Sequence, residues 1–176
     1  MHRILVKKQS GGIKEKIRLA SSKSESNRAL IINALSGFGG DLQNLSTARD
    51  TQTMIRLLKS ADAVADVLDA GTTMRFLTAY FAITNQSKTM TGTPRMCERP
   101  IGILVDALKS IGCEIEYLAK EGYPPTQLKG FKEQKTNEIS IRGDVSSQYI
   151  SALLMISPLL PNGLCINLLG EIGSIP

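Results

Sequence analysis

The stretch ASSKSESNRAL, residues 20–30, concentrates side chains that bind anions. Lys23 and Arg28 lie five residues apart within it, and serines, including Ser24, and an asparagine surround them. An apolar run at 29–32 follows at once, so these polar residues stand where a helix would begin. The N-terminus of a helix carries partial positive charge and unpaired N–H groups. The stretch therefore predicts a phosphate or carboxylate site, although an ordinary capped helix with two solvated cations has the same pattern.

Three later clusters have a similar composition, and each stands at the start of a predicted helix: Asp69, Gly71 and Thr72; Arg95 and Arg99; and Ser146, Ser147 and Gln148. Helix capping explains any one of them better than a binding site does. Four clusters in one chain favour an oxygen-rich ligand with more than one anionic group. Converging helix ends would each contribute ~0.3–1 kcal/mol to holding it, and charge-assisted hydrogen bonds roughly 1.5–3 kcal/mol each.

Alternating helix and strand patterns predict an α/β (α+β) fold that would position these clusters. Helices are expected at 26–35, 49–60, 71–83, 101–111 and 146–156, and strands at 1–6, 14–19, 41–45, 63–68, 86–92, 113–117, 126–129, 138–142 and 164–168. All of these helices except 49–60 are largely apolar, so we expect them to be buried on all sides. Thr47 and Asp50 resemble a capping box at the start of the helix 49–60.

Composition narrows the class of protein. The chain has 176 residues, of which 42% are hydrophobic, enough for the core of one domain. Its cysteines (Cys97, Cys113 and Cys165) are widely spaced and His2 is its only histidine, so we expect a metal-free protein of the reducing cytoplasm. No apolar run reaches the length of a membrane span, and residues 1–10 lack the features of a signal peptide. We therefore expect no membrane partner.

Charge is concentrated near the start of the chain. Residues 1–30 hold eight basic and two acidic side chains, whereas the rest of the chain is nearly neutral. A basic segment of this kind could bind nucleic acid. The low aromatic content, 5%, and the mixed signs of Lys14, Glu15 and Lys16 argue against that partner. We expect small anionic ligands instead of nucleic acid.

Five stretches together resemble the 5-enolpyruvylshikimate-3-phosphate synthase family: SKSESNRAL (22–30), DAGTTMRFL (69–77), GTPRMCERPIGILVDAL (92–108), GYPP (122–125) and GDVSSQYISALLM (143–155). Members of this family transfer the enolpyruvyl group of phosphoenolpyruvate to the 5-hydroxyl group of shikimate 3-phosphate and release phosphate, a step of aromatic amino-acid biosynthesis. The resemblance implies two similar domains, each built from repeated βαβαββ units with buried helices and with sheets that face solvent. It divides this chain into an N-terminal strand, 1–13, that packs into a second domain, and one nearly complete substrate-binding domain, 14–176.

The resemblance also implies a role for each motif residue. Lys23 is the expected catalytic residue. Shikimate 3-phosphate is expected to bind Lys23, Ser24, Arg28, Ser146, Ser147, Gln148 and Ser174. Phosphoenolpyruvate is expected to bind Lys23, Asp69, Gly71, Thr72, Arg99 and Gln148, with Arg95 in support. The resemblance implies no cofactor and no metal.

Three departures from the family pattern bear on these expectations. Asp69 stands where many members have asparagine, and its carboxylate would repel phosphoenolpyruvate unless an arginine paired with it. Ala20 and Ser21 stand where Pro-Gly commonly precedes the first motif, and Phe76 replaces a common proline.

The length of the chain is the largest departure. Members are more than twice as long, so we expect this chain to be inactive alone. A second domain would have to supply an acidic base, a lysine and further arginines. We also expect the chain to be monomeric. Two alternatives remain open: enolpyruvyl transfer to a UDP-amino sugar, and a non-catalytic module that binds anions or nucleic acid.

Overall fold

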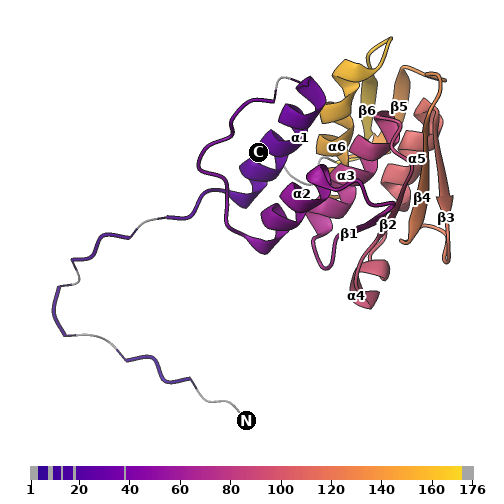
Figure 1. Ribbon diagram of the computed structural model, residues 1–176. Coiled ribbons are helices and arrows are strands. Elements are labelled where there is room, and N and C mark those ends of the chain that lie inside the picture. The colour runs from indigo at the N-terminus through magenta and orange to yellow at the C-terminus, as the bar shows by residue number, and fades with distance from the viewer. Residues whose placement is uncertain (1–3, 8–9, 13, 18, 38, 172–176) are drawn as a thin grey trace.

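The computed structural model describes residues 4–7, 10–12, 14–17, 19–37 and 39–171 (Figure 1). Its helices are α1 (Lys23–Ser36), α2 (Arg49–Lys59), α3 (Gly71–Ile83), α4 (Pro94–Cys97), α5 (Gly102–Ile111) and α6 (Ser147–Ile156), with a 3-10 turn, η1 (Ser157–Leu159). Its strands are β1 (Val64–Asp66), β2 (Lys88–Thr91), β3 (Cys113–Tyr117), β4 (Thr126–Phe131), β5 (Glu138–Arg142) and β6 (Cys165–Leu169). The expected α/β class is confirmed.

Four of the strands form one sheet in the order β1-β2-β4-β3. β1 and β2 are parallel and joined through α3, whereas β4 runs antiparallel to both β2 and β3. The side chains of Ala65, Met90 and Leu128 point from this sheet into the core and are almost fully buried. Residues 64–131 therefore form one βαβαββ unit, the unit expected from the resemblance.

The remaining two strands form a second sheet. β5 and β6 are parallel, in a register that pairs Ile139 with Ile166 and Ile141 with Leu168, and α6 connects them. The inner side chains of β5 are buried, but those of β6 are mostly exposed, with Leu169 53% exposed. β5 of this sheet packs against α5.

The helices pack between and beside the sheets. In Figure 1, α1 and α2 lie on the far side of α3 and α6 from the four-stranded sheet, and α3 contacts α1, α2, α5 and α6 as well as β4. α3 is buried on nearly every side, as expected, and Phe76, Leu77 and Phe81 are at most 1% exposed. Burial of α1 on all sides is a wrong expectation, because α1 lies at the edge of the helical layer and Ile32 is 54% exposed. α5 and α6 are likewise open on one side, at Ile103 and Leu154.

The strands expected before α2 are also wrong. The described residues of 1–6, 14–19 and 41–45 form no strand, because no neighbouring strand in the described part of the chain offers its backbone hydrogen bonds. Residues 4–6 and 17 expose most of their apolar side chains, and this segment runs away from the body in Figure 1. Residues 1–3, 8–9, 13 and 18 lie outside the described residues, and the expected packing of 1–13 into a second domain stays a prediction.

Helix starts differ from the sequence patterns in three places. α1 begins at Lys23, three residues earlier than expected, because the Ser22 hydroxyl accepts a hydrogen bond from the Glu25 amide at 3.2 Å and caps the helix. The capping box at Thr47 and Asp50 is wrong, since α2 starts after Ala48 without a side-chain cap. The short helix α4, capped by Thr93, was not expected. No helix in the described ranges is long and apolar enough to cross a bilayer.

Candidate functional site

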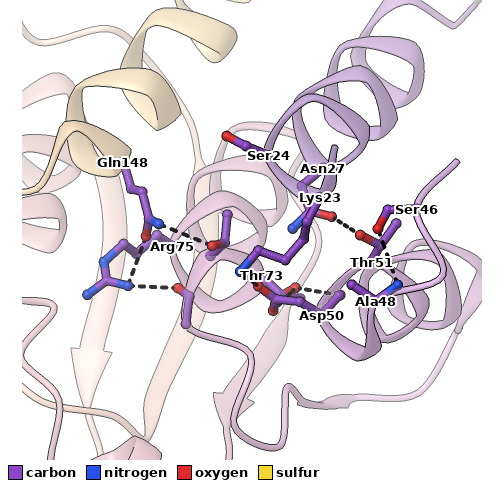
Figure 2. A network of polar contacts seen from close by, with 12 residues as sticks. Lys23, Ser24, Asn27, Ser46, Ala48, Asp50, Thr51, Thr73, Arg75 and Gln148 are labelled. Carbon is purple, nitrogen blue, oxygen red and sulfur yellow. Dashed lines mark hydrogen bonds and ion pairs between the residues drawn. The ribbon is translucent and has the colours of Figure 1, made fainter. Parts of the chain in front are cut away.

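The starts of α1, α2 and α3 meet around Asp50. The Lys23 ammonium lies 3.2 Å from Asp50 Oδ2, and Thr73 Oγ1 donates to Asp50 Oδ1 at 3.1 Å (Figure 2). Thr73 also donates to the Asp50 carbonyl oxygen at 3.0 Å. The Lys23 side chain is 49% exposed, so this pair holds the ammonium at the surface with one side open to a ligand.

Arg28 connects α1 to α6. Its Nη2 donates to Ser151 Oγ at 2.9 Å, and its Nη1 donates to Ser24 Oγ at 2.5 Å and to the Ser24 carbonyl oxygen at 3.2 Å. The guanidinium also lies 5.4 Å from the centre of the Phe76 ring in α3. Three helices therefore fix one cation, and a guanidinium in a fixed place can bind a phosphate or carboxylate with two parallel hydrogen bonds.

The start of α6 meets the start of α3. Gln148 Nε2 donates to Thr72 Oγ1 at 3.1 Å, and Arg75 Nη1 donates to Gln148 Oε1 at 3.1 Å (Figure 2). Ser146 caps α6, because its hydroxyl accepts from the Gln148 amide at 3.4 Å. Ser146 and Ser147 are both exposed, so their hydroxyl groups are accessible to a ligand.

Gly71 brings Arg99 close to the start of α3. A Cβ atom at Gly71 would overlap the Arg99 guanidinium, so the missing side chain is what allows that approach. Arg95 and Arg99 line a hollow of about 630 Å³ together with Met96 and Asp69. This hollow has the charge expected for a phosphate or carboxylate.

Asp69 lies between two groups of cations. It lines the hollow with Arg95 and Arg99, and also a second hollow of about 250 Å³ with Lys23 and Arg49. Its Oδ1 accepts a hydrogen bond from Thr93 Oγ1 at 2.5 Å, and within the described ranges it forms no ion pair. The pairing of this carboxylate with an arginine stays a prediction.

Most of the expected site residues therefore lie around the starts of α1, α3 and α6 and the segment before α5. Ser174 lies outside the described residues.

Immediately before α6, the hydrogen bonds from Arg142 hold the pKa of the exposed Asp144 below its usual range. Over the described ranges, no cluster of three or more histidine, cysteine or acidic residues is arranged to hold a metal ion.

Three residues of the site were missed by sequence reasoning: Arg49, Arg75 and Ser151. Arg75 lies four residues after Gly71 and Ser151 four residues after Ser147, spacings that place each pair on one helix face. Those spacings could have identified Arg75 and Ser151. Arg49 is the first residue of α2, and only the fold shows that this helix starts beside Lys23.

Known proteins with a similar sequence are longer than this chain. A 3-phosphoshikimate 1-carboxyvinyltransferase of Bacteroides fragilis (strain YCH46) is 56% identical over 164 residues, which are 93% of this chain and 40% of that protein. The protein of the same name from Erwinia tasmaniensis is 40% identical over 186 aligned residues, covering 91% of this chain and 43% of the relative. The chain thus spans about two-fifths of the length of these relatives.

A solved structure and a family model agree with these relatives. The structure of EPSP synthase from Acinetobacter baumannii superposes with a TM-score of 0.73 at 16% identity, over 89% of this chain and 41% of that one, which establishes the shared fold. The family model for EPSP synthase matches residues 58–174, a range that includes the starts of α3 and α6 and the segment with Arg95 and Arg99. This chain belongs to the EPSP synthase (3-phosphoshikimate 1-carboxyvinyltransferase) family.

Proposed function

We propose that this chain forms the shikimate 3-phosphate-binding part of an enzyme that transfers the enolpyruvyl group of phosphoenolpyruvate to the 5-hydroxyl group of shikimate 3-phosphate. The observation that carries the proposal is the meeting of three helix starts. Arg28 in α1 reaches Ser151 in α6 at 2.9 Å, and Gln148 in α6 reaches Thr72 in α3 at 3.1 Å. A phosphorylated ligand would find cations, hydroxyl groups and an amide on one continuous surface.

Each of the two substrates would bind its own group of residues. Arg28, Ser24, Ser147 and Gln148 would hold shikimate 3-phosphate, with Ser146 and Ser174 in the same group. Lys23, Gly71, Thr72 and Arg99 would hold phosphoenolpyruvate, supported by Arg95 and with Asp69 at the boundary. Arg99 and Lys23 line the two hollows that Asp69 shares, which supports a ligand that carries both a carboxylate and a phosphate.

The reaction needs two proton transfers. A proton must reach the methylene carbon of phosphoenolpyruvate, and the acceptor hydroxyl group must lose one. We assign Lys23 to this chemistry, and we assign the remaining acid–base groups to the part of the relatives that this chain does not span. Closure of that second domain would also bring the reactants together, an effect worth roughly 7–11 kcal/mol when the geometry is ideal. The chain alone is therefore expected to bind shikimate 3-phosphate without turnover.

The proposal extends to location and partners. Cys97, Cys113 and Cys165 are all free thiols, which suits a reducing cytoplasm. The partners would be the two anionic substrates and the second domain, with the chain itself monomeric. Addition of a separately produced second domain should restore part of the activity.

The test is a titration of the ¹⁵N-labelled chain with shikimate 3-phosphate, followed by amide and side-chain chemical shifts. Saturable shifts are expected at Ser24, Arg28 and Gln148, and much weaker ones with shikimate, which lacks the phosphate. Stronger binding of UDP-N-acetylglucosamine would favour transfer to a UDP-amino sugar. Affinity that ignores ligand structure and falls steeply with salt would indicate a general anion or nucleic-acid module. Either of these results would overturn the proposal.

A further inference from the structure

Arg75 is a largely enclosed cation in the second turn of α3. Its Nη1 donates to the Gly71 carbonyl oxygen at 2.9 Å and to Gln148 Oε1 at 3.1 Å (Figure 2). Its guanidinium also lies 5.0 Å from the centre of the Tyr149 ring. The Tyr149 hydroxyl donates to the Pro100 carbonyl oxygen at 2.8 Å, so the ring under the guanidinium is itself held in place. Arg75 is therefore fixed by α3, by α6 and by the segment before α5.

The chemistry of the guanidinium decides how Gln148 is oriented. An arginine side chain only donates hydrogen bonds, whereas the amide of glutamine has one accepting oxygen and one donating nitrogen. Gln148 must therefore turn Oε1 toward Arg75, and its Nε2 then faces Thr72 Oγ1 at 3.1 Å. Without Arg75, the reverse orientation of the amide would compete, with Oε1 accepting from the Thr72 hydroxyl.

The Thr72 hydroxyl group completes this chain of hydrogen bonds. A hydroxyl group has a single proton to donate, and its oxygen can accept as well. Thr72 Oγ1 accepts from Gln148, and among the hydrogen bonds of the described residues it donates none. Thr72 is the second residue of α3 and is only 6% exposed, so few water molecules can compete for its proton.

We propose that Arg75 is a positioning residue: by holding Gln148 Oε1 it makes Gln148 donate to Thr72, which leaves the Thr72 hydroxyl proton to donate to an anionic oxygen of phosphoenolpyruvate. Arg75 itself touches no substrate. This inference rests on the proposed function for the identity of the ligand, but the orientation of Gln148 does not depend on any ligand. The two parts can therefore be tested separately.

The first test needs no ligand. The side-chain amide of Gln148 is assigned by NMR in the ¹⁵N-labelled chain and compared with that of Arg75→Met and Arg75→Lys. Arg75→Met removes the donor to Gln148 Oε1 and should shift the Gln148 Nε2 resonance, whereas Arg75→Lys keeps a donor-only group and should shift it less. Lys132→Gln is the matched control for the loss of one positive charge, because the Lys132 side chain is 81% exposed and pairs with Glu114 of the four-stranded sheet. An unchanged Gln148 resonance in folded Arg75→Met, which removes the donor, would overturn the positioning role.

The second test is a double-mutant cycle on phosphoenolpyruvate affinity, measured with saturating shikimate 3-phosphate. Thr72→Val should weaken binding by about 10-fold or more, the range expected for a hydrogen bond to a charged group, and Thr72→Ser should retain the affinity within about 3-fold. Arg75→Met should cause a similar loss in the parent chain. In the Thr72→Val background, Arg75→Met should lower phosphoenolpyruvate affinity by less than about 2-fold, because the hydroxyl group through which Arg75 acts is already absent.

The two failures are distinguishable. Equal losses from Arg75→Met in both backgrounds would show that Arg75 acts through its charge or through packing, and would overturn the inference while leaving the proposed function intact. A parent chain that binds neither substrate would count against the proposed function, and the Gln148 resonance would then still decide the role of Arg75.

Discussion

Arg28 in α1 donates a hydrogen bond from Nη2 to Ser151 Oγ in α6 at 2.9 Å, although 123 residues separate them along the chain. The same guanidinium holds Ser24 through Nη1 and lies over Phe76 of α3. One side chain thus connects three helices near their starts. Because these contacts fix the guanidinium, little reorganisation should accompany the binding of an anion at this point.

Removal of Arg28 should weaken binding more than removal of its partner. Arg28→Ala is expected to lower shikimate 3-phosphate affinity by about 10-fold or more, because a charge-assisted contact is lost. Ser151→Ala leaves the charge and removes only one neutral hydroxyl group that fixes it, so a loss of about 5-fold is expected. Calorimetric titration of both variants measures the difference in shikimate 3-phosphate affinity. Lys129→Gln, in the four-stranded sheet, is the control. A larger loss for Ser151→Ala than for Arg28→Ala would contradict this ranking.

The burial of α3 predicts a contrast between two identical substitutions. Leu77 in α3 is fully buried, whereas Leu154 in α6 is 55% exposed. Leu77→Ala should lower the free energy of unfolding by ~2–5 kcal/mol through lost contacts and the cavity left behind. Leu154→Ala should change the free energy of unfolding by no more than ~0.5 kcal/mol. Urea unfolding of the two variants measures both values, and similar losses would show that α6 is covered on its outer face.

Cys113 should make stability depend on alkaline pH. Burial raises the pKa of this thiol from 9.0 to about 12 in the folded chain. Below about pH 9 the thiol is protonated in both states and its contribution is fully present. As the pH rises toward 12, the unfolded chain releases the proton while the folded chain keeps it, so the free energy of unfolding falls by at most about 1.4 kcal/mol per pH unit.

The measurement compares Cys113→Ala with the parent chain in reducing buffer. Tyr117, whose pKa burial also raises to about 12, contributes to the fall in both proteins and cancels in the difference. The variant should lose less stability than the parent over this range, and Cys165→Ala, at an exposed position, should behave like the parent. Parallel curves for the parent and Cys113→Ala would disprove the assignment to this thiol.

Local patterns predicted the elements whose partners are close in sequence. The helix 71–83 was predicted with its observed bounds, since Gly71 marks its start and apolar residues predominate from Met74 to Ile83. The strand 113–117 was predicted equally well, because its alternation matches a half-buried edge of the sheet. Helix-start chemistry also predicted that Arg28 and Gln148 belong to one site, a binding role that stays a prediction.

Tertiary contacts decided what the patterns could not predict. Asp50 looked like a capping residue, but its carboxylate instead holds Lys23 and Thr73 from two other helices. Ile32 looked like a core residue, yet no element in the described part of the chain covers that face of α1. Arg75 has a helical spacing from Gly71, but its role depends on the distant Gln148, which that spacing does not indicate. These three errors came from partners more than 20 residues away or from a neighbour that the described chain does not supply.

Gly71 offers the sharpest separation of binding from stability. A Cβ atom there would overlap the Arg99 guanidinium and would lie 3.1 Å from Arg75 Nη1. Both neighbours are the ends of flexible side chains, so the backbone can stay in place while the arginines move. Alanine also favours a helix over glycine by about 1 kcal/mol. Gly71→Ala should therefore leave the free energy of unfolding unchanged or slightly higher.

Phosphoenolpyruvate affinity should fall in Gly71→Ala, although stability should not. With Arg99 displaced, phosphoenolpyruvate affinity in Gly71→Ala should fall by about 10-fold or more, and Arg99→Lys should cause a similar fall because it keeps the charge but loses the two-pronged geometry. Shikimate 3-phosphate affinity should fall less than phosphoenolpyruvate affinity, because the added Cβ atom does not meet Arg28 and reaches Gln148 only through Arg75. Gly12→Ala is the matched control, because a Cβ atom there meets no neighbour within 4 Å. Titration of each ligand separately is the measurement, and an equal loss for both would mean that Arg99 does not act on phosphoenolpyruvate alone.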